Sequence, residues 1–312
     1  MKIDKLIGVL DIGSNSIMLT VAIADTVKPT ILTEFCKVTK LGENSATTGE
    51  LQQDAMERTT KAVTKFVRQA HSMGVRDFVG TATSAVRDAE NGSAFIKELS
   101  SQIGFTPQIL SGPEEADAVF RGTTAGLKPG RKIITCDPGG GSTEINIGIT
   151  GDHPFFGHSY NVGCVRHGDR YNLYDTVKPE DIELARKDIF DSFTDAFKSI
   201  DNPEEYDLYI SSGTATTFAA VKMAMIEYNR EKVHHSNGTL EEMEMWIKKL
   251  FAIPLCERAK IPGLGERAPM LPTGMLIMAE VMKGFGKKEF TVSTNALRYG
   301  MLLKASEKLL KD

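Results

Sequence analysis

Two related stretches decide the fold: VLDIGSNSIMLTVAIAD at residues 9–25 and TCDPGGGSTEINIGITG at residues 135–151. Each joins one apolar run to a second through Asp-x-Gly and a turn of small polar residues. Asp11 aligns with Asp137, and the glycine and serine that follow align at the same offset. Apolar runs of this length beside glycine turns are typical of buried strands in a hairpin. The repeat therefore predicts two equivalent halves, each opening with a strand, a glycine-rich turn and a second strand.

From each repeat the hydrophobic pattern continues as strands and helices. The first half is predicted to hold strands at 6–12, 17–24, 30–39, 76–81 and 108–110, and helices at 51–73, 93–103 and 113–127. The second is predicted to hold strands at 132–137, 143–150, 155–162, 206–211 and 288–293, and helices at 179–199, 214–228, 239–251 and 266–284. A hinge is expected at 127–132, and a last helix at 297–310. This order indicates the α/β class.

Composition and charge exclude several classes of function. The 312 residues carry 37 Lys and Arg against 41 Asp and Glu, a net charge of −4, which argues against a nucleic-acid partner bound by broad charge attraction. No apolar run approaches the ~20 residues that span a bilayer, so no membrane association is expected. The four cysteines lie far apart without a CxxC pair, which indicates neither a zinc knuckle nor a disulfide framework and favours a reducing cytoplasm.

The two turns have the composition of a phosphate-binding site. Glycine lets the backbone approach an anion, and turns of this kind present several N–H donors together. Side-chain donors are expected from Ser14, Asn15, Ser16, Ser142 and Thr143. An aspartate at the strand end repels phosphate unless Mg²⁺ lies between them. A single turn fits an ordinary hairpin equally well, whereas two in register favour the functional interpretation.

Other polar residues have two interpretations each. Glu144 could join Asp137 on one metal, or be a solvent-facing strand residue. Gly213, Thr214 and Thr216, in SSGTATT, could bind an anion at a helix N-terminus or cap that helix. Arg87 could be a surface charge or a phosphate clamp. The six histidines lack metal-ligand spacing and are expected at the surface, with His234 and His235 pointing different ways.

The pair Glu114 and Glu115 opens the predicted helix at 113–127. Acidic residues in a first turn are ordinary partners of the helix dipole. The alternative is that one of them is a general base that orients a water. Sequence alone leaves both interpretations open.

Six motifs in order resemble the Ppx/GppA family of exopolyphosphatases and guanosine pentaphosphate phosphohydrolases. They are DIGSNS (11–16), ATSAVRDAENG (82–92), SGPEEADAVFRG (111–122), DPGGGSTE (137–144), SSGTATT (211–217) and STNALRYG (293–300). The resemblance spans nearly the whole chain and is closest to the short two-domain form. It implies two RNase H-like α/β domains of the actin, Hsp70 and sugar-kinase superfamily with a cleft between them. The implied boundaries are 1–126 plus 298–312 for the N-terminal domain and 127–297 for the C-terminal domain.

The resemblance also assigns site residues. Glu115 matches the catalytic glutamate, and Asp137 and Glu144 match the metal-binding carboxylates, with Asp11 as a further ligand of Mg²⁺. The implied phosphate- and substrate-binding residues are Gly13, Ser14, Asn15, Ser16, Arg87, Gly139, Gly140, Gly141, Ser142, Gly213, Thr214 and Arg267. Arg267 departs from the family's RAD segment, because Pro269 replaces the aspartate.

The function implied is a Mg²⁺-dependent exopolyphosphatase that releases terminal orthophosphate from inorganic polyphosphate. A guanosine pentaphosphate (pppGpp) phosphohydrolase and a non-catalytic sensor of polyphosphate or pppGpp are the alternatives, and a kinase of the same superfamily is a further rival. A homodimer is expected by analogy. Arg166, Lys222, Arg267 and Arg298 are candidates for a basic track along a polyphosphate chain.

Overall fold

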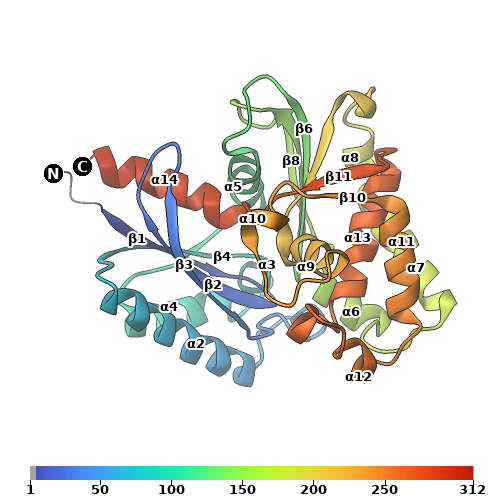
Figure 1. Cartoon of the computed structure of the whole chain (residues 1–312). Coiled ribbons are helices and arrows are strands. Elements are labelled where there is room, and N and C mark those ends of the chain that lie inside the picture. The colour runs from blue at the N-terminus through green and yellow to red at the C-terminus, as the bar shows by residue number, and fades with distance from the viewer. Residues whose placement is uncertain (1–4, 312) are drawn as a thin grey trace. The chain divides into compact units, whose positions relative to one another are not determined.

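The computed structural model describes residues 5–311, and the chain divides into two compact units. The first unit extends to Gly126 and resumes at Leu297, whereas the second runs from Leu127 to Ala296. Each contains one mixed β-sheet with helices, as Figure 1 shows. The α/β class predicted from the sequence is therefore confirmed.

The first unit is built on a five-stranded sheet of order β3-β2-β1-β4-β5. Its elements are β1 (Leu6–Ile12), β2 (Ser16–Ile23), β3 (Thr30–Val38), α1 (Ser45–Thr48), α2 (Gln53–Ser72), β4 (Asp77–Ala82), α3 (Ser84–Asp88), α4 (Gly92–Ile103), β5 (Gln108–Ile109), α5 (Gly112–Thr124) and α14 (Leu297–Lys311). Strands β1, β2 and β3 form an antiparallel meander, and β4 and β5 continue parallel to β1.

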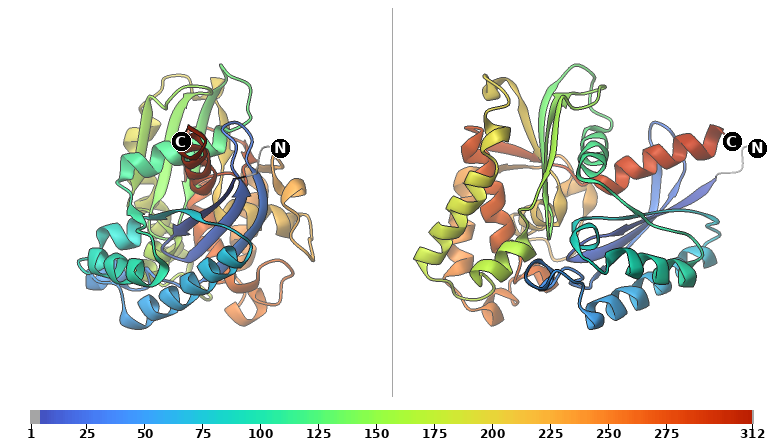
Figure 2. Two further views of the ribbon diagram at one scale, coloured as in Figure 1. Left: turned by 90° about the vertical axis from the view of Figure 1, so that its left-hand side faces the viewer. Right: turned by 180° about the vertical axis from the view of Figure 1, so that it is seen from behind.

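Alternate residues of β1 enter two different hydrophobic clusters. Leu10 and Ile12 pack with α2 and α4, which lie side by side along one face of this sheet (Figure 2). Ile7 and Val9 pack instead with α5 and α14. Because strand side chains alternate between faces, β1 is buried on both sides, which accounts for its unbroken apolar sequence.

Helix α14 returns the end of the chain to the first unit. A Cβ at Gly300 would lie 2.0 Å from the carbonyl oxygen of Ala118 on α5, so the two helices approach too closely for a larger residue. An ion pair between Arg121 and Glu307 joins the same helices, and Lys5 Nζ donates to the Leu309 carbonyl at 2.7 Å.

The second unit repeats this topology. Its sheet order is β10-β11-β9-β6-β7-β8. The elements are β6 (Lys132–Pro138), β7 (Thr143–Ile149), β8 (Phe156–Tyr160), α6 (Cys164–Tyr171), α7 (Pro179–Ser192), α8 (Thr194–Phe197), η1 (Pro203–Glu205), β9 (Asp207–Ile210), α9 (Ser212–Lys222), α10 (Arg230–Val233), β10 (Asn237–Thr239), α11 (Leu240–Phe251), α12 (Leu255–Arg258), η2 (Gly265–Arg267), α13 (Leu271–Gly284) and β11 (Glu289–Val292). The strand directions match those of the first sheet: β8, β7 and β6 form an antiparallel meander, and β9 and β11 continue parallel to β6. This match confirms the predicted doubling.

Several element predictions were wrong in detail. The predicted helix at 266–284 begins only at Leu271, because Pro272 is accepted in a first turn but not in a helix interior. The predicted helix at 214–228 ends at Lys222, just before Ala224 adopts a left-handed φ of 50°. Helices α3 and α6 were not predicted, since each is only a turn or two long.

Candidate active site

The first glycine turn joins β1 to β2. The Gly13 amide donates to the Ser16 carbonyl at 3.2 Å, which closes the turn. The Ser14 carbonyl accepts from Gly42 N at 2.8 Å, and the Asn15 carbonyl accepts from the amides of residues 39 and 40 at 3.0 and 2.9 Å. A loop of the same unit therefore holds two successive carbonyls of this turn.

The second turn, between β6 and β7, has the same closure. The Gly139 amide donates to the Ser142 carbonyl at 2.8 Å, and a Cβ on either Gly13 or Gly139 would lie 3.0 Å from the serine carbonyl that closes its turn. The next carbonyls contact the start of α6: the Gly139 oxygen accepts from Cys164 N at 3.0 Å, and the Gly140 oxygen from Val165 N at 2.8 Å.

Because each peptide is planar, a contact that fixes a carbonyl also fixes the direction of the N–H group in the same peptide. In a trans peptide the C=O of one residue and the N–H of the next point opposite ways, and the described part of the chain contains no cis peptide. The amides of Gly140, Gly141 and Asn15 therefore point away from the groups that hold the preceding carbonyls. Successive amides turned to one side form the kind of concavity that binds an anion.

The hydroxyls of the turns are less available than the sequence predicts. Ser14 Oγ lies 3.1 Å from Ser84 Oγ in a buried contact. Thr143 Oγ1 donates to the Val162 carbonyl at 2.6 Å, so this hydroxyl is committed within the unit. Asn15 is also buried. The turns thus offer an anion mainly their backbone.

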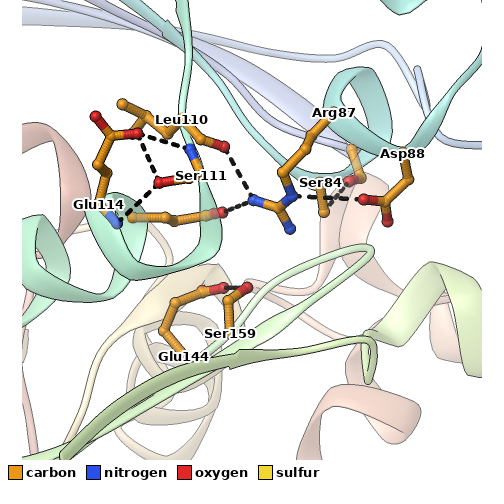
Figure 3. Close-up of polar contacts among 10 residues, drawn as sticks. Ser84, Arg87, Asp88, Leu110, Ser111, Glu114, Glu144 and Ser159 are labelled. Carbon is orange, nitrogen blue, oxygen red and sulfur yellow. Dashed lines mark hydrogen bonds and ion pairs between the residues drawn. The ribbon is translucent and has the colours of Figure 1, made fainter.

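Asp137 and Glu144 face each other across the β6–β7 hairpin as direct partners in the strand register. Glu144 is 3% exposed, so its interpretation as a solvent-facing residue was wrong. Ser159 Oγ donates to Glu144 Oε1 at 2.7 Å (Figure 3). Burial, followed by the charges of Asp137 and Glu144, raises the pKa of the Cys136 thiol well above its usual range.

This carboxylate pair fits a hard divalent cation. Like charges directly opposite each other on a sheet are destabilising, and carboxylates are the protein ligands that Mg²⁺ takes, one or two per ion alongside water and phosphate. Among residues 5–311 no group of three or more His, Cys, Asp and Glu side chains could hold a metal ion. Asp137 and Glu144 are the two carboxylates of this hairpin that would hold Mg²⁺.

Asp11 is the counterpart of Asp137, but Met18 lies opposite it. Asp11 Oδ1 is buried and has no hydrogen-bond partner. Burial raises the pKa of Asp11 to about 6, and the nearby Arg298 guanidinium opposes that shift. Because Asp11 belongs to the first unit, its role as a third metal ligand stays a prediction.

The first turn of α5 separates the two neighbouring glutamates. Ser111 and Glu114 form a capping box, in which Ser111 N donates to Glu114 Oε2 at 2.9 Å and Ser111 Oγ accepts from Glu114 N at 3.4 Å (Figure 3). The Ser111 hydroxyl also donates to Glu114 Oε2 at 2.7 Å, and this bond, followed by the one from Ser111 N, lowers the pKa of Glu114. The dipole-partner interpretation therefore holds for Glu114.

Glu115 is instead turned inward and is 4% exposed. Arg87 Nη1 donates to Glu115 Oε2 at 2.6 Å and to the Leu110 carbonyl at 3.2 Å, while Arg87 Nε lies 3.4 Å from Asp88 Oδ1 (Figure 3). Arg87 is on α3 and is half-buried rather than a surface charge. The guanidinium thus fixes one oxygen of a buried carboxylate.

A third polar cluster lies at the start of α9. Ser212 has a φ of 89°, a conformation unusual for a non-glycine residue, and its Oγ accepts from Thr214 N at 3.1 Å. The N-cap residue Ser211 makes no side-chain capping bond, so Ser212, and not a threonine, supplies the side-chain oxygen for this first-turn amide. Thr216 Oγ1 donates to the Ser212 carbonyl at 3.0 Å, so it is not an open anion donor.

Arg267 lies directly over Gly213. A Cβ on Gly213 would be 1.7 Å from Arg267 Nη1, so only glycine leaves room for the guanidinium. Burial raises the pKa of the Cys164 thiol to about 11, and the charge of the nearby Arg267 opposes that rise. The structure thus brings Arg267 to the starts of both α9 and α6.

Two of the four candidates for a basic track are paired with carboxylates. Lys222 Nζ lies 2.6 Å from Glu242, and Arg298 Nη2 lies 3.1 Å from Glu34, so both charges are paired with carboxylates. Arg166 contacts the second turn, where Nε donates to the Gly141 carbonyl at 2.8 Å. This contact was missed because α6 was not predicted, although Cys164, Gly168 and Tyr171 recur at helical spacing.

Two predictions about histidines were wrong. His167 is 2% exposed, with Nε2 3.3 Å from Asp188 Oδ2, and burial lowers its pKa. The rings of His234 and His235 stack at 3.8 Å between centroids instead of diverging, because the chain turns at His235 with a φ of 62°.

The chain resembles proteins of a known family over nearly its whole length. Residues 20–309 match the Ppx/GppA phosphatase family, and the chain belongs to it. Exopolyphosphatase 2 of Mycobacterium tuberculosis is 26% identical over 95% of this chain and 97% of its own length. A bifunctional 3-dehydroquinate synthase/phosphatase of Fusobacterium nucleatum is 29% identical over 96% of this chain, which spans only 46% of that protein.

Solved structures of the family share the fold. A crystal structure of an exopolyphosphatase from Cytophaga hutchinsonii matches with a TM-score of 0.89 and 26% identity, covering 97% of this chain and 98% of the other. The Aquifex aeolicus family member matches with a TM-score of 0.80 and 26% identity, covering 99% of both chains. The fold is thus that of this family. None of the helices in residues 5–311 combines the length and apolarity required to cross a membrane.

Proposed function

We propose that this phosphatase is a Mg²⁺-dependent exopolyphosphatase that releases terminal orthophosphate from inorganic polyphosphate. The observation that carries the proposal is the pair of equivalent glycine turns, whose carbonyls are held by neighbouring groups so that the following amides point away from those groups. Two relatives named exopolyphosphatase, from Mycobacterium tuberculosis and Cytophaga hutchinsonii, support polyphosphate as the substrate class.

Groups of both units take part in the proposed reaction. The backbone amides of the two turns bind phosphate oxygens, and Arg267 and the start of α9 add charge and donors through Gly213 and Thr214. Asp137 and Glu144 would hold Mg²⁺, with Asp11 as a further ligand. The ion would supply positive charge that stabilises the phosphate oxygens. Phosphoryl transfer depends mainly on such positioning and charge stabilisation.

Glu115 is the group we assign to the attacking water. Its carboxylate is buried, and Arg87 fixes one of its oxygens at 2.6 Å, so it can accept a hydrogen bond from water in a set orientation. Attack by that water on the terminal phosphorus breaks one phosphoanhydride bond. The products are orthophosphate and a chain one unit shorter, and the water's protons pass to Glu115 and the released phosphates.

The test is orthophosphate release from purified protein with Mg²⁺, comparing long-chain polyphosphate with pppGpp. Glu115→Gln keeps the size of the side chain but not its charge, and should lower turnover by roughly 10²–10⁴-fold while substrate still binds. Glu114→Gln is the matched control, because glutamine also completes a capping box and turnover should stay near wild type.

The outcomes separate the alternatives. Faster release from polyphosphate supports the proposal, whereas preference for pppGpp would make the protein a pentaphosphate phosphohydrolase. Tight binding without release from either substrate would make it a sensor. Near-wild-type turnover of Glu115→Gln would remove Glu115 from the assigned role. The predicted homodimer and cytoplasmic location remain predictions, which sedimentation and cell fractionation can test.

A further inference from the structure

The second glycine turn differs from the first in having a charged side chain behind it. Arg166 Nε donates to the Gly141 carbonyl at 2.8 Å, whereas the first turn's carbonyls of Ser14 and Asn15 contact backbone amides of residues 39–42. Arg166 is half-buried and lies in the first turn of α6.

The start of α6 is fitted closely to this turn. A Cβ on the N-cap residue Gly163 would lie 2.3 Å from the Gly140 carbonyl oxygen. The amides of Val165 and Arg166 both reach that oxygen, at 2.8 and 3.2 Å. The backbone of α6 thus satisfies the carbonyls of Gly139 and Gly140, and the carbonyl of Gly141 is left to the side chain of Arg166.

The direction of that bond decides on which side of the turn Arg166 Nε lies. The Gly141 carbonyl points toward Nε, so the N–H of Ser142 points away from it. The amides of Gly140 and Gly141 likewise point away from the α6 amides that hold the carbonyls of Gly139 and Gly140. Nε is therefore on the side of the Gly141–Ser142 peptide that is opposite the Ser142 N–H.

We propose that Arg166 is a positioning residue: it fixes the Gly141 carbonyl and, through that peptide plane, aims the Ser142 amide at the bound phosphoryl group. This positioning role replaces the interpretation of Arg166 as part of a basic track along the polyphosphate chain. The inference rests on the proposed function, since it assumes that the turn binds the terminal phosphate.

The two interpretations differ in how the effect depends on substrate length. Arg166→Met keeps the apolar stem and removes the donor, and should raise the KM about tenfold, the size expected when a buried carbonyl loses its partner. A positioning role predicts the same factor for tripolyphosphate and for long-chain polyphosphate, with kcat changed less than KM. Arg166→Lys can still donate and should recover most of the loss. Arg170→Met is the control, because Arg170 is on the same helix with a side chain that is 61% exposed.

Binding measured by calorimetry keeps this inference separate from the proposed function. Tripolyphosphate should bind Arg166→Met about tenfold more weakly than wild type, even if neither protein hydrolyses it. A loss that grows with chain length would overturn the proposal and make Arg166 a chain contact. Unchanged affinity and KM in Arg166→Met would also overturn it. Thermal unfolding of Arg166→Met and Arg166→Lys shows whether a loss of affinity reflects misfolding. If Arg166→Met does not fold, Arg166→Lys becomes the test. A folded Arg166→Lys protein that does not retain affinity for tripolyphosphate would decide against the proposal.

Discussion

The two glycine turns have nearly the same backbone but different surroundings. Each closes with an amide-to-carbonyl bond from its first glycine to its last serine, at 3.2 Å in the first unit and 2.8 Å in the second. A loop holds the carbonyls of the first turn, whereas a helix start and an arginine hold those of the second. The residue opposite the aspartate is Met18 in one hairpin and Glu144 in the other.

The two units share one part of the site chemistry, and each adds side chains that the other lacks. The shared part is the anion-binding backbone, which glycine and peptide geometry provide in both units. The added part is local: the second unit has the carboxylate pair and Arg267, and the first has Glu115 fixed by Arg87.

The largest effect is expected from removing the second carboxylate. Glu144→Gln should lower Mg²⁺-dependent turnover by roughly 10²–10³-fold, since a metal that stabilises the transition state contributes several kcal/mol. The Mg²⁺ concentration for half-maximal rate should also rise. Met18→Leu, at the equivalent position opposite Asp11, should leave both quantities near wild type. Initial rates over a Mg²⁺ titration measure this, and an unaltered Mg²⁺ dependence would remove Glu144 from the metal site.

Asp11 should affect how the free energy of unfolding depends on pH. With metal chelated, the raised pKa of Asp11, about 6 against an ordinary 3.8, makes the folded protein bind a proton more tightly than the unfolded chain. This stabilisation is fully present below pH 3.8 and is lost as pH rises through 6, by at most about 3 kcal/mol. Asp11→Asn should flatten the urea unfolding profile between pH 4 and 7. An equal slope in both proteins would contradict a buried, proton-binding Asp11.

Replacing a glycine that packs against each turn tests how closely the neighbouring chain is fitted to that turn. Gly163→Ala places a methyl group 2.3 Å from the Gly140 oxygen, whereas Gly42→Ala places one 3.0 Å from Ser14 Cβ. Overpacking against backbone costs about 1–3 kcal/mol, so Gly163→Ala should weaken phosphate binding and lower the Tm more than Gly42→Ala does. Calorimetry and thermal unfolding of both variants check this order. Equal effects would mean that the support of the second turn is no tighter than that of the first.

The smallest effect is expected at Arg267. Gly213→Ala should push the guanidinium away without removing it, since its Cβ would lie 1.7 Å from Nη1. It should therefore raise the KM about as much as Arg267→Met does, by about tenfold. The double variant should be no worse than either single one, because both remove the same contact. Additive losses would instead show that Gly213 and Arg267 act separately.

Much of the candidate site could be predicted from the sequence because its chemistry lies in short segments. Asp-x-Gly turns between apolar runs determine strand ends, closing bonds and the position of each aspartate. Glu114 and Glu115 show the limit of this reasoning. Both open the same helix, and only the capping box and the Arg87 ion pair separate the capping residue from the buried carboxylate.

The sequence by itself determined the duplicated strand–turn–strand units, the α/β class and the family, since these depend on local periodicity and ordered motifs. Only the tertiary structure decided which side chains are buried and paired. The contacts of Arg87 with Glu115, of Arg166 with Gly141, of Ser159 with Glu144 and of Arg267 with Gly213 join residues 15 to 54 positions apart. Chain folding brings such residues together, and no local pattern encodes the partner of a charged side chain.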